Sequence, residues 1–534
     1  MVLPRRAHPK SANWLVAQLL EQIRKVEILW NLTCHPLDDK VYLLAKTENI
    51  FTYKLKLRGG KGFLMPAQSV ILLEFNEICP QLLDKFMNGG LLPNFKRFYE
   101  HSDIYITQAD ITETSQLEPW IQWYSIHTGL RYRDHKVFSL TDGPRAGHTD
   151  IWEVLRSHGK KVGNCASMNS KGFRAEGSFC LPDPWCTSES VSPPELAVFH
   201  QMIARQVQGY TNKDATSGRA REVLGFLRFL VSHGLRAKTA LQIARQLFQD
   251  QVLDRSTSWK RAVLLDKLQF DVFRFYYRKL HLDFATFFIN STAHYQHAYW
   301  RHMFPEEFTT KPSPEEIEKY KDCILFGYQE MDKVLGDFFK LRNKQTTLIL
   351  ASALSQKAFL RRDLEGGQHF YRLRDVNSFL QSLHISCKDI LPVMTNQYVA
   401  VFDQQSEADR AVAILKAFKY NGEEVFGFGR AEPKSIYFGS QLFRVVPQDA
   451  TIEVDGTVEK IPFYDLLYKI EEMKSGCHHE DGVLWICRGR HEIHAEKVSV
   501  LDIFPTVLGL CGVEPLVELC NQCQGKELMS AAVA

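Results

Sequence analysis

The sequence predicts an α/β protein, an α/β/α sandwich built around a mainly parallel central sheet. Short apolar runs rich in β-branched and aromatic residues recur along the chain, at 70–75, 284–290 and 347–350. Amphipathic stretches of helical period lie between such runs, and glycines such as Gly89 and Gly159 end some of them. Strands that alternate with helices in this way form parallel sheets with helices on both faces.

The core elements follow in order from residue 67. Each predicted strand is a short apolar run, as expected for strands buried in a parallel sheet. The helix at 314–341 begins with SPEE at 313–316, which places proline and two acidic residues in its first turn. The strands are expected at 70–75, 104–108, 161–165, 284–290 and 347–350, the helices at 80–87, 91–98, 151–158 and 314–341, and the segments 484–487 and 498–511 return to the core.

Two stretches depart from this pattern. Residues 191–281 are helical in period and rich in Arg, Leu and Phe, so we interpret them as a helical insertion over one end of the sheet. Within 361–480, short strands surround a helix that Ser406 caps, with Asp409 three residues further on. This second pattern predicts a small α+β insertion.

These patterns divide the chain into six parts. The N-terminal part is predicted to hold an amphipathic helix at 11–30 and short strands at 41–45 and 50–57. The parts are 1–66 (N-terminal helix and short strands), 67–190 (first part of the core), 191–281 (helical insertion), 282–360 (second part of the core), 361–480 (α+β insertion, cap-like) and 481–534 (last part of the core and tail).

Composition and charge narrow the classes of partner. The 534 residues are 45% hydrophobic and 24% charged, with a net charge of +3 and both signs interleaved, which predicts no nucleic-acid binding. No apolar run approaches the roughly 18 residues that cross a bilayer, so no membrane partner is expected. The twelve cysteines are scattered, which favours reduced thiols in the cytoplasm. The oligomeric state cannot be derived from the sequence.

One cysteine pair is closely spaced. Cys520 and Cys523 form a C-x-x-C, and the nearest other candidate ligands are at 477–479 (CHH). Because a second pair is missing nearby, a mobile tail is a better interpretation than a zinc or redox site.

Polar residues follow the first core strand. Glu74, Asn76 and Glu77 lie at or just after a continuous apolar run. Buried polar groups need partners, so this strand end is either a functional site or a hydrogen-bonded junction.

Four segments, in this order, resemble the alkaline phosphatase superfamily, in particular its branch of type I phosphodiesterases, nucleotide pyrophosphatases and sulfatase-like enzymes. They are 90–95 (GLLPNF), 124–130 (YSIHTGL), the helix from 320 through 336, and 499–508 (SVLDIFPTVL). The resemblance covers residues 68–170, 284–356 and 484–513. It implies the α/β/α fold and chemistry by two divalent metals that flank a Thr or Ser nucleophile.

The second-metal ligands that the resemblance implies are replaced. The first aspartate falls on Asn76, the nucleophile falls within 118–120 (EPW), and an Asp-His pair falls on Ala353 and Leu354. Alanine and leucine cannot ligate a metal, so this site is expected to be lost.

More of the first-metal ligands that the resemblance implies are kept. It falls on Asn290, His294 and His491, and an amide oxygen is a weaker ligand than a carboxylate. Two histidines and an amide could hold one zinc-like ion with an open position. The candidates to complete this set are Glu77, Glu118, His297 and His494.

The run 112–123 lies where the nucleophile would be presented. Glu118 is predicted to act as a general base or as a carboxylate nucleophile, and Trp120 and Trp123 to stack on a sugar or base. Alternatively, Thr114 or Ser115 supplies a displaced hydroxyl nucleophile. The plain interpretation is a helix N-terminus with buried tryptophans.

Two further histidines are candidate substrate contacts. His297 lies just past a strand end, three residues after His294, and His135 follows the segment 128–129. The alternative is that such histidines pack among aromatic residues and bond to the backbone.

Three functions remain open. The first is a divergent hydrolase or transferase for a phosphate or sulfate ester or a phosphodiester, of a small molecule, glycan or nucleotide, with at most one zinc-like metal and with Glu118 as base or nucleophile. The second is a metal-free, non-catalytic protein that binds a carbohydrate or nucleotide, with Trp120, Trp123 and Trp300 as stacking platforms. The third is a metal-independent mechanism with Glu77 and Glu118 as an acid and base pair.

Overall fold

The computed structural model describes residues 69–113, 116–186, 189–208, 220–393, 396–429, 432–458, 460–470, 473–513 and 523–528. The predicted N-terminal part at 1–66, and Thr114, Ser115 and Cys520, lie outside these residues. The chain divides into two compact units, 1–67 with 235–268, and 68–234 with 269–534. The residues expected to form one helical insertion therefore belong to both units.

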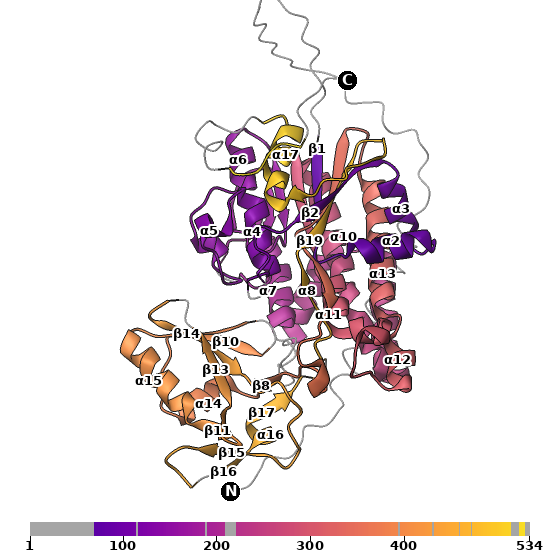
Figure 1. Ribbon diagram of the computed structural model, residues 1–534. Coiled ribbons are helices and arrows are strands. Elements are labelled where there is room, and N and C mark those ends of the chain that lie inside the picture. Colours follow the sequence, from indigo (N-terminus) through magenta and orange to yellow (C-terminus); the bar gives the residue numbers. More distant parts are fainter. Residues whose placement is uncertain are drawn as a thin grey trace, which may run out of the picture. The chain divides into compact units, whose positions relative to one another are not determined.

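A large sheet forms the centre of the second unit (Figure 1). Its strand order is β20-β2-β19-β6-β1-β5-β3-β4, and β21 pairs with β2. The strands are β1 (Ser69–Phe75), β2 (Ser102–Gln108), β3 (Val162–Cys165), β4 (Phe179–Leu181), β5 (Phe284–Ile289), β6 (Thr346–Ser352), β19 (Asp481–Cys487), β20 (Glu492–Ile493) and β21 (Val498–Ser499). Within this described sheet the pairings are parallel except those of β19 with β2 and β6, which confirms the predicted α/β class and its mainly parallel sheet.

The register defines one edge of the sheet as the carboxyl edge. At the end of β1, Phe75 pairs with Ile289 of β5, and β6 ends beside them. Because β19 is reversed, its first residue, Asp481, lies opposite Gln108 at this same edge. Its last residue, Cys487, lies opposite Ser102 at the other edge. Residues that precede β19 therefore reach the carboxyl edge, and residues that follow it do not.

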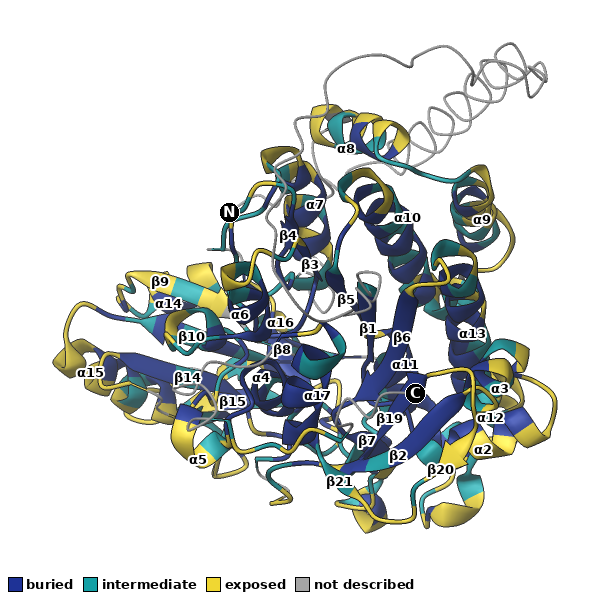
Figure 2. Cartoon of the chain, turned by 90° about the horizontal axis from the view of Figure 1, so that it is seen from above, coloured by how far each residue is buried: buried dark blue, intermediate teal, exposed yellow. Residues whose placement is uncertain are grey.

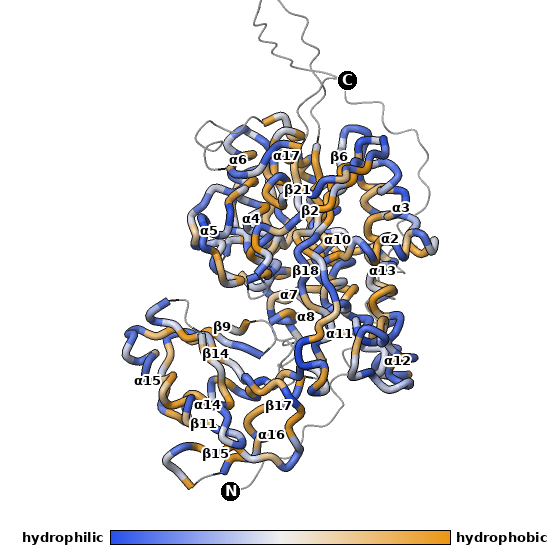
Figure 3. Tube along the Cα trace, in the orientation of Figure 1, coloured by the Kyte–Doolittle hydropathy of each residue, from blue (hydrophilic) through white to orange (hydrophobic). Residues whose placement is uncertain are grey.

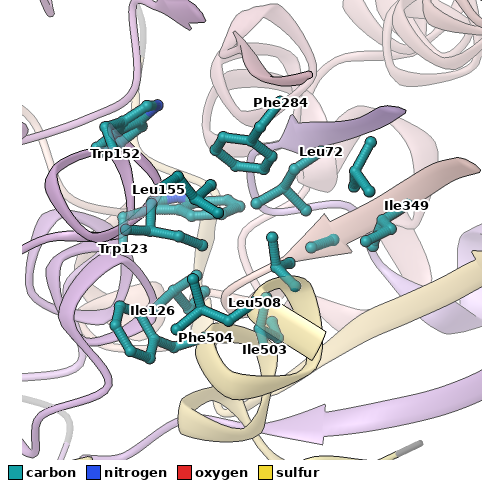
Figure 4. Close-up of a cluster of buried hydrophobic side chains, with 14 of the residues drawn as sticks. Leu72, Trp123, Ile126, Trp152, Leu155, Phe284, Ile349, Ile503, Phe504 and Leu508 are labelled. Carbon is teal, nitrogen blue, oxygen red and sulfur yellow. The ribbon is translucent and has the colours of Figure 1, made fainter. Parts of the chain in front are cut away.

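Helices cover one face of the sheet through a large apolar cluster (Figure 4). These helices are α4 (Pro119–Thr128), α6 (Ile151–Ser157) and α17 (Ile503–Leu510). Trp123, Trp152 and Phe504 pack toward Leu72 and Phe284 of the strands, and all five are at most 1% exposed. Burial of aromatic area on this scale is a main source of the stability of a domain.

The opposite face is covered by α3 (Pro93–Tyr99), α10 (Ala262–Leu280) and α13 (Cys323–Leu341). Phe287 of β5 lies 5.2 Å from Phe273 of α10 and 5.0 Å from Phe338 of α13, measured between ring centroids. The central strands β5 and β6 are buried throughout, and β1 is buried except at its first residue, Ser69 (Figure 2). This arrangement is the α/β/α sandwich that the sequence predicts.

Further helices lie outside these layers. They are α2 (Pro80–Asn88), α5 (Tyr132–His135), α7 (Ala197–Gln208), α8 (Ala220–Ser232), α11 (Ser291–Met303) and α12 (Pro314–Tyr320). The short helix α12 is largely hydrophilic (Figure 3) and begins with a capping box between Ser313 and Glu316. The predicted single helix at 314–341 is thus two helices, α12 and α13. Of the described helices, none is long and apolar enough to cross a membrane.

The α+β insertion has an apolar core of its own, which includes Phe379, Leu415, Phe426 and Phe438. Its elements are β8 (Tyr371–Leu373), β9 (Asp389–Pro392), β10 (Gln397–Val401), β11 (Phe418–Tyr420), β12 (Glu423–Glu424), β13 (Phe426–Gly429), β14 (Ser435–Ser440), β15 (Thr451–Val454), β16 (Lys460–Pro462), β17 (Leu467–Lys469), α14 (Val376–Ser382), α15 (Gln405–Lys416) and α16 (Phe463–Leu466). The chain enters this insertion from β7 (Ser355–Ala358) and leaves it through β18 (Gly476–His479), and these two strands pair antiparallel. We call this pair the neck.

A buried carboxyl and imidazole pair links β1 to α4. Glu74 Oε1 lies 2.8 Å from His127 Nε2, and the two side chains are 0% and 2% exposed. Trp152 packs on the His127 ring with centroids 4.8 Å apart. Each group depends on the other, because a buried polar atom without a partner is costly.

We expect His127→Ala to lower the free energy of unfolding by about 3 kcal/mol, since it leaves the Glu74 carboxyl unpaired in the core. The Glu74→Leu/His127→Leu double variant should recover part of this loss. Urea unfolding of His127→Ala, Glu74→Leu, His127→Leu and the double variant forms the test. A double variant that is destabilised by the sum of the two single leucine changes would contradict this coupling.

Candidate active site

The carboxyl group of Glu77 is the centre of a polar cluster at the carboxyl edge of the sheet. Glu77 follows β1 with φ 59°, a left-handed conformation that is uncommon for a residue with a side chain, and it is 2% exposed. Its Oε2 lies 3.0 Å from Nε2 of His297 and 3.5 Å from Nε2 of His478. His297 belongs to α11, and His478 belongs to β18 in the neck.

Both histidines are oriented by backbone carbonyls. Nδ1 of His297 donates to the carbonyl of Gly476 (3.0 Å), and Nδ1 of His478 donates to that of Leu117 (2.6 Å). A carbonyl oxygen accepts only, so the proton on each Nδ1 is fixed and each Nε2 points to Glu77. The site thus holds two imidazoles of defined orientation against one carboxylate.

Three amides complete the surroundings of Glu77. Asn76 donates from Nδ2 to Glu77 Oε1 (2.9 Å), and the Gln356 amide donates to Oε2. Gln296 donates to the backbone carbonyl of Glu77 (2.6 Å). These bonds offset the desolvation cost of the buried carboxyl group and stabilise the unusual backbone conformation of Glu77.

The charges in the cluster shift each other's pKa values. Burial by itself would raise the pKa of the Glu77 carboxyl, but the imidazoles of His478 and His297 outweigh it and hold that pKa well below its usual range. Burial would lower the pKa of His478, but Glu77 and then Glu118 raise it above its usual value. The ionised form of Glu77 and the protonated form of His478 therefore stabilise each other.

Glu118 lies on the other side of His478. It is the N-cap residue of α4, and its Oε2 is 3.4 Å from Nδ1 of His478. Its side chain is 29% exposed, and burial raises the pKa of its carboxyl group. His478 therefore stands between the two carboxyl groups, so this geometry does not favour a direct acid and base pair of Glu77 and Glu118.

The structure brings Glu77, Glu118 and His297 together. Three other predicted residues, Asn76, Asn290 and Trp123, are joined to them by hydrogen bonds. Asn76 uses its amide fully, since Nδ2 also donates to Asn290 Oδ1 (2.8 Å) and Oδ1 accepts from Trp123 Nε1 (2.8 Å). Trp123 is 0% exposed in the apolar cluster, which corrects its predicted place as a stacking platform. Asn290 is exposed at the N-terminus of α11.

Three other predicted residues have different surroundings. His294 is partly buried in the first turn of α11, and its ring contacts Tyr295. Trp120 is partly exposed and donates to the carbonyl of Phe138 (2.8 Å). His135 is buried against Ser125 Oγ (3.0 Å), and burial lowers its pKa to about 3. His135 thus fills the interior as a neutral group.

His491 lies at the opposite edge of the sheet, which corrects the expectation that it joins His294. The neighbouring Glu492 pairs with Asp103 near the start of β2, and His491 Nδ1 bonds to the carbonyl of Tyr99 (2.8 Å). The reason is the reversed direction of β19, because residues after this strand lead away from the carboxyl edge. His478, which precedes β19, reaches the carboxyl edge instead and pairs with Glu77.

Sequence reasoning did not assign His478 and Gln356 to this site. The only signal for His478 was its place in the CHH segment just before an apolar strand. Gln356 carried no signal, because a glutamine after a strand resembles an ordinary polar surface residue.

The donor set fits a single metal ion. The ligand atoms of Glu77, His297 and His478 all lie within 4.8 Å of one another. Their separations of 3.0 and 3.5 Å bracket the roughly 3.3 Å between neighbouring ligands of a tetrahedral zinc ion with bonds of about 2.0–2.1 Å. Two neutral imidazoles with Nδ1 bonded to carbonyls and one carboxylate match the set of a catalytic site.

The fold and this site define an α/β sandwich protein with a candidate two-histidine, one-carboxylate centre. No protein family model matches the chain, and no curated protein sequence matches it. Solved structures with similarity to the chain include members of the alkaline phosphatase superfamily.

One is phosphonoacetate hydrolase from Sinorhizobium meliloti 1021, at 13% identity and a TM-score of 0.39, with 84% of this chain and 96% of that chain covered. Another is murine ectonucleotide pyrophosphatase/phosphodiesterase 5, at 12% identity and a TM-score of 0.34, with the same coverage. The alkaline phosphatase PafA aligns at 14% identity and a TM-score of 0.38, over 87% of this chain and 99% of that chain. With TM-scores below 0.5, these alignments assign no role to a residue of this chain.

The opposed pKa shifts predict how the cluster stabilises the fold with pH. Because the pKa of Glu77 is lower in the folded state, its ionised carboxylate stabilises the folded protein above about pH 4.3. This stabilisation is lost as the pH falls through the folded-state pKa. Because the pKa of His478 is higher in the folded state, its protonated imidazole stabilises the folded protein fully below about pH 6.5. This stabilisation is lost as the pH rises through the folded-state pKa. In buffer with a chelator, the difference in unfolding free energy between wild type and Glu77→Gln should be largest between about pH 4.3 and 6.5. A difference that is flat from pH 4 to 8 would disprove this coupling.

Proposed function

We propose that the protein hydrolyses or transfers a phosphate or sulfate ester, or a phosphodiester, with one divalent metal held by Glu77, His297 and His478. One observation carries this proposal. Both imidazoles commit Nδ1 to a backbone carbonyl, and both Nε2 atoms converge on one carboxylate oxygen at the carboxyl edge of the sheet. When both imidazoles are neutral and Glu77 is ionised, the two Nε2 atoms and the carboxylate oxygen are all electron-pair donors. They repel one another unless a cation or protons lie between them.

A single metal is the best fit to the surrounding residues. Ala353 and Leu354 are both 0% exposed, and Leu354 packs with Ala109 and Leu117. The space beside Glu77 is filled by the amide of Gln356, which also donates to the carbonyl of Ala293 (3.1 Å). A bound zinc-like ion would supply Lewis acidity toward the oxygen atoms of the ester.

Glu118 is proposed to move the proton. Its carboxyl group has a raised pKa and a partly exposed side chain, so it can exchange protons closer to neutral pH than an ordinary glutamate. Its position 3.4 Å from Nδ1 of His478 also lets it orient that ring. Asn76 and Gln296 fix Glu77, and Trp120 offers a partly exposed ring to a sugar or base at the margin of the site.

The substrate class is a small-molecule or glycan ester, as the resemblance implies. We also propose a cytoplasmic location, which the scattered cysteines support.

A metal-free binding protein is the second candidate, and the saturation of Glu77 favours it. Its two carboxyl oxygens already receive Asn76, Gln356 and both imidazoles, so two protonated histidines could balance the carboxylates of Glu77 and Glu118. Under this alternative the polar cluster binds an anion or a sugar and turns nothing over.

Metal analysis separates the two candidates. We expect purified protein, loaded with zinc and dialysed, to retain about one ion per chain, because three ligands from three segments converge. His478→Ala and His297→Ala should each lower the affinity at least about tenfold. His491→Ala is the matched control, since it removes an exposed histidine at the other edge of the sheet and should leave the affinity unchanged. Retention of zinc by both site variants would rule out this centre.

Glu118→Gln tests the proton-transfer role. Against a panel of aryl phosphates, phosphodiesters and aryl sulfates, we expect kcat to fall about 100-fold or more, with KM and the zinc content close to wild type. The acid limb of the kcat profile should disappear as well. Loss of zinc without a change in the pH profile would instead make Glu118 a positioning residue, and no turnover of any substrate class by zinc-loaded wild type would defeat the enzymatic proposal.

A further inference from the structure

The first unit presents an apolar stripe to solvent. It consists of α9 (Ala237–Phe248) and the π-helical turn η3 (Gln249–Leu253), which is followed by η4 (Arg255–Arg261). Leu241 and Phe248 are 62% and 44% exposed on α9, and Val252 and Leu253 are 60% and 70% exposed on η3. The positions 241, 248 and 252 differ by seven and four residues, so these side chains lie along one side of the helix.

The same stripe is basic. Arg245 is exposed and lies between Leu241 and Phe248 at the four-residue and three-residue spacings that place side chains on one face. Residues 235–249 contain three basic residues and no acidic one. Figure 2 shows much of α9 exposed. Its exposed residues include the apolar Leu241 and Phe248 and the basic Arg245.

The acidic residues that follow α9 neutralise it only in part. Asp250 is 1% exposed and pairs with Arg261 (2.6 Å), and Asp254 caps η4 by accepting from the backbone N–H of Ser256 (2.8 Å). Across 235–268 there are seven basic and three acidic residues. Among the described residues of 235–268, the exposed basic residues, Lys238, Arg245 and Arg261, outnumber the exposed acidic residue, Asp254.

We propose that α9 and η3 dock on an anionic lipid surface. A helix that shows apolar side chains and basic side chains on its exposed face is typical of proteins that lie on a membrane without spanning it. Leu241, Phe248, Val252 and Leu253 enter the boundary between headgroups and acyl chains, while Arg245 contacts the phosphates. Each basic residue near such a surface strengthens binding roughly fivefold.

Charge favours lipid over two other occupants. A second copy of the chain would place one basic stripe against another, and like charges at an interface oppose association. Residues 1–67 of the chain hold eleven basic and five acidic residues, so their net charge has the same sign as the stripe. An anionic membrane has the opposite sign. The sequence predicts no membrane partner because no apolar run is long enough to span a bilayer. Binding to the surface of a membrane does not require such a run.

Vesicle sedimentation with the full chain tests the proposal. We expect the protein to bind vesicles of phosphatidylcholine with phosphatidylglycerol, to bind neutral phosphatidylcholine vesicles weakly, and to lose binding as salt increases. Leu241→Gln/Phe248→Gln and Arg245→Glu should each lower the partition coefficient at least about tenfold. Val458→Gln is the matched control, because it removes a fully exposed apolar residue from the α+β insertion and should bind as wild type does.

Several results would overturn the proposal. They are failure to bind anionic vesicles, equal binding to neutral vesicles, or equal losses in the control and in the α9 variants. A dimer in solution that Leu241→Gln/Phe248→Gln converts to a monomer would assign the stripe to a second copy instead. Far-ultraviolet circular dichroism verifies that each variant is folded. Arg245→Glu tests the contribution of charge separately, because it leaves the apolar residues in place.

Discussion

The desolvated carboxyl group of Glu77 holds together three parts of the chain that are distant in sequence. It lies at the end of β1, accepts from Gln356 of β7, and pairs with His297 of α11 and His478 of β18. A buried carboxylate without partners is costly, so these segments must approach for the first strand to end as it does. The geometry of the site is thus a requirement of the fold as well as the basis of the proposed chemistry.

The direction of one strand decides which residues reach this carboxyl group. If β19 were parallel to its neighbours, residues 488–491 would lie at the carboxyl edge and the neck would not. Because β19 is antiparallel to β2 and β6, the neck delivers His478 to Glu77, and the Arg490 side chain instead pairs with Asp103 at the other edge (3.0 Å). Each edge of the sheet therefore has its own charged cluster.

The sequence supported the fold more fully than the site. Apolar runs located β1, β5 and β6, and the position of Glu77 and Glu118 at the ends of elements pointed to the right edge. The same patterns could not reveal the direction of β19, because a buried apolar run reads alike in both directions. Trp123 was misplaced for a related reason. α4 is buried almost all round, so its sequence has no polar face to show which side chains point inward.

The neck has a consequence for how this architecture can vary. Its two strands leave and rejoin the sheet side by side, and the residues between them enclose a hydrophobic interior of their own. A chain with a tight turn from Ala358 to Gly476 would keep every hydrogen bond of the central sheet and would still carry His478. The same frame can thus accept insertions of different size, while the polar cluster around Glu77 keeps its residues.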